Sequence, residues 1–130
     1  MPLDKLFSIG HHYLDSLTKT IQVKKLNLLQ GTLDLIVLKV LASGAQHGYA
    51  ISQRIQEVSS DLLKVEEGSL YPALYRMEKK GWIQSRWGVT DKQRRARLYT
   101  LTHDGQRHLA EEAQQWTALT GVMDRIMELG

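Results

Sequence analysis

The segment VEEGSLYPALYRMEKKGWI, residues 65–83, restricts the fold of this chain more than any other stretch of its sequence. Leu70, Leu74 and Met77 recur at the spacing of one helix face, so that face is expected to be buried. The rest of the helix surface carries hydroxyl, aromatic and cationic side chains close to its start: Ser69, Tyr71, Pro72, Tyr75 and Arg76. These side chains either cover an edge of the core or form a binding surface.

Two residues set the expected ends of this helix. Proline is tolerated in the first helical turn, where its missing N–H would have no partner within the helix. Pro72 therefore predicts a start between Gly68 and Tyr71, and Gly81 predicts the end. The free N–H groups at such a start favour an anion.

Helical periodicity also occurs on both sides of this segment. Apolar spacing predicts helices over residues 28–42 and 49–58, with a turn between them at residues 43–48. A single long helix is predicted over residues 102–129, capped near Thr102.

Two strands are predicted between the third helix and the long one. Residues 82–89 and 95–101 alternate in polarity, and the intervening residues are polar and basic, as expected for a hairpin loop. Three helices followed by a two-stranded hairpin is the layout of a winged helix-turn-helix. The expected fold is therefore mainly α with a small β-hairpin, extended by a long C-terminal helix.

Composition narrows the class of protein. The net charge is +3, but residues 24–103 hold 13 Lys or Arg against 7 Asp or Glu, and residues 104–130 hold two against five. A basic middle suits a phosphate-bearing partner, and an acidic tail suits a protein partner. The chain has no cysteine and no apolar run of about 18 residues, so we expect a cytoplasmic protein without a membrane span.

The predicted layout places residues 65–83 where a helix-turn-helix inserts its second helix into the major groove of DNA. Hydroxyl, tyrosine and arginine side chains suit contacts with bases, sugars and phosphates. The basic loop can follow phosphates or enter a minor groove, although a solvated loop has the same composition. The residues expected to face DNA are Ser69, Tyr71, Pro72, Tyr75, Arg76, Lys79, Lys92, Arg94, Arg95 and Arg97.

The long last helix carries an apolar stripe that a domain of this size cannot cover alone. The stripe comprises Leu109, Ala113, Trp116, Leu119, Thr120, Met123, Ile126 and Met127. A second copy of the chain could bury it, and a two-fold dimer would match a palindromic DNA site. Packing onto the N-terminal segment of the same chain is the alternative. The expected parts are a helical N-terminal extension at 1–25, a DNA-binding domain at 26–102 and a dimerisation helix at 103–130.

Several blocks of this sequence, taken in order, resemble the PadR family of bacterial transcriptional regulators. They are LLQGTLDLIVLKVL, HGYAISQRI, VEEGSLYPALYRMEKKGWI, WGVTDKQRRARLYTLTHDG and the tryptophan of EEAQQWTAL. The resemblance covers about residues 28–129 and implies a winged-helix homodimer that binds a palindromic promoter site and usually represses it. It also implies DNA contacts by Tyr49, Ser69, Tyr71, Tyr75, Arg94 and Arg95.

The resemblance suggests a further role for one aromatic residue. Trp116 matches a tryptophan that, in compact multidrug-sensing relatives, lines a pore between the subunits and stacks on planar drugs. A small aromatic effector is therefore one expectation for Trp116, and plain packing at the dimer interface is the other.

Other classes of function find less support in the sequence. It has no Gly-rich phosphate loop, no defensible Ser/His/Asp order and no metal-ligand spacing, so we expect neither an enzyme nor a bound cofactor or metal. A winged helix used only for protein contacts remains open. A protein that attaches to a membrane surface through residues 1–25 is the least favoured alternative.

Overall fold

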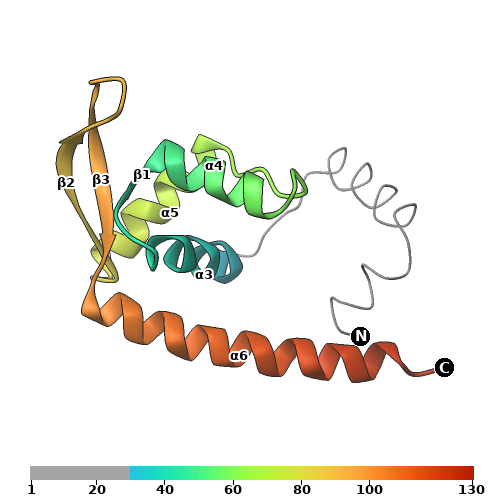
Figure 1. Cartoon of the computed structure of the whole chain (residues 1–130). Coiled ribbons are helices and arrows are strands. Elements are labelled where there is room, and N and C mark those ends of the chain that lie inside the picture. The colour runs from blue at the N-terminus through green and yellow to red at the C-terminus, as the bar shows by residue number, and fades with distance from the viewer. Residues whose placement is uncertain (1–29) are drawn as a thin grey trace.

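The structure is a computed structural model and describes residues 30–130; the expected helical extension at residues 1–25 lies outside them. The described part is mainly helical with a small antiparallel sheet, which confirms the predicted fold class. Its elements in chain order are α3 (Gln30–Leu41), β1 (Gln46–His47), α4 (Gly48–Val58), α5 (Glu67–Lys79), β2 (Ile83–Val89), β3 (Arg95–Leu101) and α6 (His103–Met127). Figure 1 shows α6 along one side of the molecule and the free end of the β2–β3 hairpin on the other.

The sheet contains one strand more than predicted. β2 and β3 form the expected hairpin, paired from Ile83 opposite Leu101 to Val89 opposite Arg95. β1 joins the other edge of β3, so the strand order is β1-β3-β2. The sequence predicts only a turn over residues 43–48, because a strand of two residues is too short to show alternation.

The start of α5 also differs from the prediction. The helix begins at Glu67, so Pro72 lies in its second turn and not in the first. Proline has no N–H to donate to the carbonyl of Gly68 four residues earlier. Gly68 is exposed, so water can reach that carbonyl. Burial of Leu70 and Leu74 on the opposite side holds the helix in place despite the missing bond.

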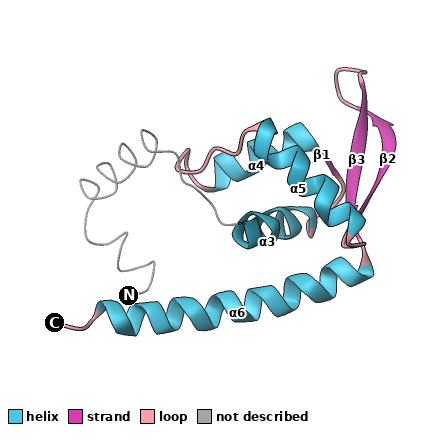
Figure 2. Cartoon of the chain, turned by 180° about the vertical axis from the view of Figure 1, so that it is seen from behind, coloured by secondary structure: helices cyan, strands magenta, loops and turns pink. Residues whose placement is uncertain are grey.

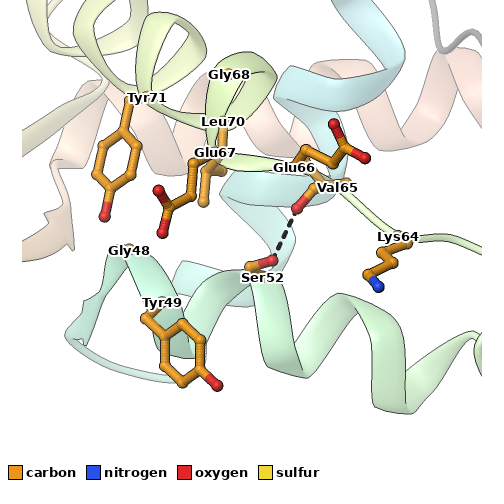
Figure 3. Close-up of a pocket in the computed structure, with 10 residues that line it drawn as sticks. All are labelled: Gly48, Tyr49, Ser52, Lys64, Val65, Glu66, Glu67, Gly68, Leu70 and Tyr71. Carbon is orange, nitrogen blue, oxygen red and sulfur yellow. Dashed lines mark hydrogen bonds between the residues drawn. The ribbon is translucent and has the colours of Figure 1, made fainter.

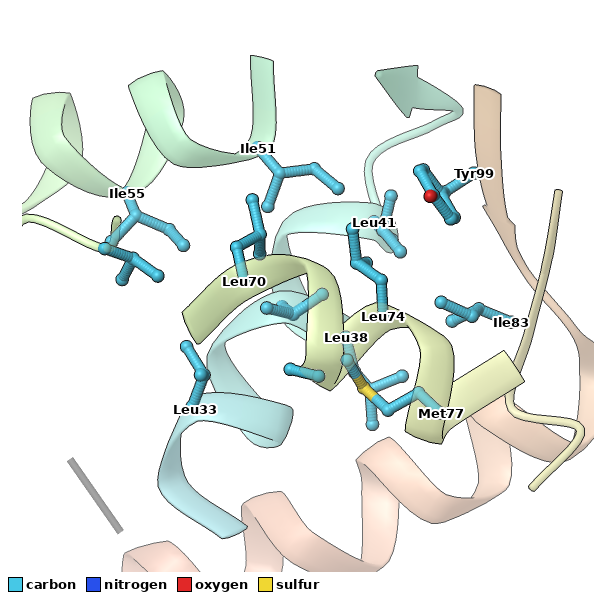
Figure 4. Packing of buried hydrophobic residues seen from close by; sticks show 13 residues of the cluster. Leu33, Leu38, Leu41, Ile51, Ile55, Leu70, Leu74, Met77, Ile83 and Tyr99 are labelled. Atoms are coloured by element: carbon cyan, nitrogen blue, oxygen red, sulfur yellow. The ribbon is translucent and has the colours of Figure 1, made fainter. Parts of the chain in front are cut away.

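The core lies between α3, α4, α5 and the base of the hairpin (Figure 4). The predicted stripe of α5 is buried there, and α3 contributes Val37, Leu38 and Leu41. Ile83 and Tyr99 bring one face of the hairpin into the same cluster. α6 packs against α3 from outside. None of the helices between residues 30 and 130 has both the length and the apolar character that crossing a bilayer requires.

The first turn of α6 is tightly joined to the beginning of the hairpin. Thr102 caps the helix as predicted, since its Oγ1 accepts a hydrogen bond from the N–H of Gly105 (3.0 Å) and donates one to the carbonyl of Gly81 (2.6 Å). A Cβ on Gly105 would lie only 2.0 Å from the carbonyl oxygen of Trp82. The Trp82 indole stacks on His108 with 3.7 Å between ring centroids. Glycine is therefore required where α6 meets the winged domain.

Replacing Gly105 with alanine should destabilise the protein strongly, because the added methyl group meets backbone atoms that cannot rotate away. We expect a loss of about 2 kcal/mol or more in the free energy of unfolding, measured by urea denaturation. Gly68→Ala is the matched control, because a Cβ on that helical glycine meets nothing within 4 Å. The control should change stability by less than about 1 kcal/mol, in the stabilising direction. Equal effects of the two substitutions would contradict the close packing at Gly105.

Candidate nucleic-acid interface

One side of the molecule, opposite α6, carries the starts of α4 and α5 and the tip of the β2–β3 hairpin (Figures 1 and 2). Ten of the eleven residues predicted to face DNA have exposed side chains; we call these ten the candidate surface. They are Tyr49 on α4, Ser69, Tyr71, Pro72, Tyr75 and Lys79 on α5, and Lys92, Arg94, Arg95 and Arg97 on the hairpin. The arrangement presents aromatic and hydroxyl groups from the helices beside cations from the hairpin.

Tyr71 and Tyr75 lie in different environments. Tyr71 is 43% exposed, and its ring lies directly against the start of α4, where a Cβ on Gly48 would be 2.9 Å from the tyrosine oxygen. Tyr75 is 65% exposed, with the ammonium group of Lys79 5.0 Å from its ring centroid. Both rings reach solvent, so neither tyrosine simply covers an edge of the core. Only Tyr71 packs one side of its ring against the domain, at Gly48.

An open cavity of about 410 Å³ lies between the starts of α4 and α5 (Figure 3). Tyr49 and Tyr71 border it, together with two acidic residues, Glu66 and Glu67, and one cation, Lys64. Those carboxylates stand at the N-terminal end of α5, where the sequence led us to expect a preference for an anion. Because the two carboxylates outnumber the ammonium group of Lys64, the net charge at this helix start disfavours a phosphate. The helix start is therefore better suited to neutral or hydrogen-bond-donating groups, such as base edges.

Arg76 does not belong to the candidate surface, and its predicted exposure is wrong. Its Nη2 donates a hydrogen bond of 2.6 Å to Oδ1 of Asp34 on α3. The arginine side chain is 28% exposed and that of Asp34 only 8%. Among the described residues, the buried Nε of Arg76 has no hydrogen-bond partner. The guanidinium group is thus used to join α5 to α3 inside the domain.

The hairpin tip has the length that the predicted strands leave between them, and hydrogen bonds within the turn hold it. The strands extend to Val89 and from Arg95, leaving five residues between them. Thr90 organises this turn: its N–H donates to the carbonyl of Arg94 (2.9 Å), and its Oγ1 accepts from the N–H of Arg94 (3.1 Å). Lys92 and Arg94 are therefore held on a compact turn, exposed to solvent.

A polar network connects the hairpin to α5. Arg97 Nη1 donates to Oγ of Ser85 (2.7 Å), and Ser85 Oγ donates to a carboxylate oxygen of Glu78 on α5 (2.6 Å). Burial, then the nearby charges of Glu78 and Tyr71, raise the pKa of the Tyr99 phenol above its ordinary value, and Arg97 opposes this shift. The Tyr99 phenol therefore keeps its proton to a higher pH than an exposed tyrosine would, because its pKa is raised.

Trp87 on β2 is an exposed aromatic residue that was not assigned to the site from the sequence. The guanidinium carbons of Arg95 and Arg97 lie 4.7 Å and 5.0 Å from its ring centroid. In the predicted hairpin, the register that places Trp87 opposite Arg97 is the signal that could have identified this cluster.

The apolar stripe of α6 is largely uncovered in the single chain. Trp116, Leu119, Met123, Ile126 and Met127 are exposed, as is Val122, which was not predicted. Ala113 is exposed and Thr120 half-buried. Leu109 differs from the rest, because it packs against the core of its own chain. Within residues 30–130, no cluster of three or more His, Asp or Glu side chains could hold a metal ion.

A family model and several solved structures resemble this chain. The model of the transcriptional regulator PadR-like family matches residues 37–111. A solved transcriptional regulator from Clostridium thermocellum is 32% identical and covers 73% of this chain and 92% of its own, with a TM-score of 0.67. A solved PadR family regulator from Clostridium difficile is 29% identical over 72% of this chain and 96% of its own, with a TM-score of 0.65. An uncharacterised protein of Lysinibacillus sphaericus is 28% identical over 102 residues, 78% of this chain and 94% of that protein.

Removing the carboxylate of Asp34 should make the domain less stable. The guanidinium group of Arg76 would then be partly buried without a counter-charge. We expect Asp34→Ala to lower the free energy of unfolding by about 3 kcal/mol. The double variant Asp34→Ala with Arg76→Leu should recover part of that loss, since both charges are then absent. Glu111→Ala, which removes an exposed carboxylate from α6, serves as the control. Additive losses in the double variant, measured by denaturant titration, would contradict a structural ion pair.

Proposed function

Because this chain belongs to the PadR-like family of transcriptional regulators, we propose that it is a cytoplasmic repressor that binds a palindromic DNA operator as a homodimer. The observation that carries the proposal is the combination of exposed tyrosines on α5 with exposed cations on the hairpin that packs against it. In this proposal α5 enters the major groove, and the hairpin acts as a wing on the backbone or in the minor groove.

The start of α5 provides the base-reading part of the proposed complex. Ser69 and the hydroxyls of Tyr71 and Tyr75 can donate or accept hydrogen bonds, and the tyrosine rings offer flat apolar surface to sugars and thymine methyl groups. Tyr49 adds a hydroxyl from α4, which accepts a hydrogen bond from Nε2 of Gln53 (3.2 Å). Because Arg76 is held by Asp34, Lys79 is the cation of α5 that remains available to phosphate.

The proposed dimer forms through the exposed stripe of α6. Two copies packed along this stripe would bury Trp116, Leu119, Met123 and Ile126, whose exposure in one chain is otherwise costly. Symmetric pairing would place two α5 helices on half-sites about one helical turn of DNA, or a multiple of it, apart.

Trp116 supports a second, subordinate proposal. Its indole is 47% exposed in the single chain, so in the α6 pairing it would stand at the subunit boundary. There it can either pack against the partner helix or stack on a planar aromatic effector that changes DNA affinity. Quenching of its fluorescence by a panel of planar aromatic compounds, abolished in Trp116→Phe, would distinguish the effector role from packing.

The operator itself can be found by selecting bound fragments from the genome and sequencing them. Enrichment of a palindrome, bound with an affinity that falls steeply as salt rises, is the expected outcome. An absence of salt-sensitive duplex binding would favour the alternative of a winged helix that contacts only proteins.

Replacing Arg94 and Arg95 together with alanine should weaken binding to every DNA sequence alike. For every phosphate that the variant no longer neutralises, the slope of log K against log salt should become shallower by about 0.9. Lys39→Ala, which removes an exposed cation from α3 outside the candidate surface, should leave the slope unchanged. Fluorescence anisotropy with a labelled duplex at several salt concentrations measures both the affinity and the slope. A slope that is the same in the two variants and the unaltered protein would exclude phosphate contacts by Arg94 and Arg95.

Introducing a charge into the α6 stripe should separate the proposed subunits. Met123→Glu buries an unpaired carboxylate in the paired stripe, so we expect a monomer by light scattering and weaker operator binding. Gln114→Glu makes the same charge change on the exposed opposite face of α6 and should leave the mass that of a dimer. A dimeric Met123→Glu variant would refute this interface.

A further inference from the structure

Trp87 occupies a place on the wing that neither the apolar core nor the family assignment explains. Its side chain is 55% exposed, although indole is among the most costly groups to leave in water. Two guanidinium groups, those of Arg95 and Arg97, lie over its ring. The three side chains therefore form one exposed cluster, in which a flat apolar indole lies beside two positive charges.

The register of the hairpin determines which way this cluster faces. Side chains two apart on a strand lie on the same face, so Trp87 shares a face with Ser85 and Ile83. Ile83 is 1% exposed and packs in the core between the hairpin and the helices. Trp87 thus continues the helix-facing side of the hairpin toward its tip, beyond the point where the core ends. On this face Trp87 comes next after Ser85, the residue of β2 that is hydrogen-bonded to Glu78 of α5.

The cluster is fixed relative to α5 and does not simply project into solvent. Arg97 contacts the ring of Trp87 and also donates to Ser85, which in turn donates to Glu78 near the end of α5. A movement of the wing away from α5 would break these hydrogen bonds. The positions of Trp87 and of the base-reading helix are therefore coupled.

We propose that Trp87 is a DNA-contacting residue that packs its indole against the deoxyribose of a duplex strand, while Arg95 and Arg97 neutralise the adjacent phosphates. A DNA strand alternates apolar sugars with anions, and an indole flanked by two guanidinium groups matches that alternation. A protein partner fits less well, because burying the indole would also bury both cations, and charged groups are depleted from the centres of protein interfaces. This inference rests on the proposed DNA-binding function and assigns that function a further residue.

The test uses the chain of residues 1–130 and a labelled mixed-sequence duplex of about two helical turns, because a sugar contact does not depend on sequence. Trp87→Ala should weaken duplex binding about tenfold without changing the slope of log K against log salt, since an uncharged side chain displaces no counterions. Arg95→Ala should weaken binding and also make the slope of log K against log salt shallower. The control is Gln84→Ala, an exposed position of β2 on the opposite face, which should bind like the unaltered protein.

A second variant keeps the test independent of any damage to the hairpin. Trp87→Phe preserves an aromatic ring, so it should bind duplex with a smaller reduction in affinity, yet the quenching of tryptophan fluorescence on DNA binding should largely disappear. Unchanged affinity of Trp87→Ala, or full quenching in Trp87→Phe, would overturn the contact. If the unaltered protein fails to bind duplex DNA in a salt-dependent way, the proposed function fails as a whole, which is a different result.

Discussion

The packing of α5 against α3 decides which side chains of this protein reach a partner. Leu70, Leu74 and Met77 fill the core, and the hydrogen-bonded pair of Arg76 and Asp34 fixes the rotation of the helix about its own axis. Rotating α5 would expose apolar surface and also separate two charges that are poorly solvated where they lie. Tyr75 lies between Leu74, which is buried, and Arg76, which is bonded to Asp34. This rotation of the helix turns Tyr75 toward solvent.

The two halves of the candidate surface, the start of α5 and the wing, differ in charge. At the start of α5 two carboxylates, Glu66 and Glu67, outnumber one lysine, Lys64, whereas the wing carries an excess of cations over its single acidic residue, Asp91. In the proposed complex, electrostatic attraction therefore comes mainly from the wing, and discrimination among base pairs comes mainly from the hydroxyl and aromatic groups of α5. The Glu78–Ser85–Arg97 network keeps the two halves in register with each other.

The periodicity of apolar residues along the sequence predicted most of this fold. The features that it did not predict depend on contacts between residues distant in sequence. The helices and the hairpin were predictable because periods of 3.6 and 2 appear in consecutive residues. The partner of Arg76 lies 42 residues away, so its helical position alone suggested a free cation. The two residues of β1 become a strand only through pairing with β3. Trp87 was overlooked because its neighbours Arg95 and Arg97 come from the other strand.

The junction at Gly105 connects the proposed dimer contact on α6 rigidly to the domain that carries α5. A palindromic site is read by two α5 helices at a fixed separation, yet the proposed contact between subunits lies on α6, on the other side of each molecule. The separation can be fixed only if α6 and the winged domain move together. The contact of Gly105 with the carbonyl of Trp82, the Thr102 cap and the stacking of Trp82 on His108 all lie at this junction. A ligand or substitution that altered this junction would therefore change the spacing of both reading helices without touching either of them.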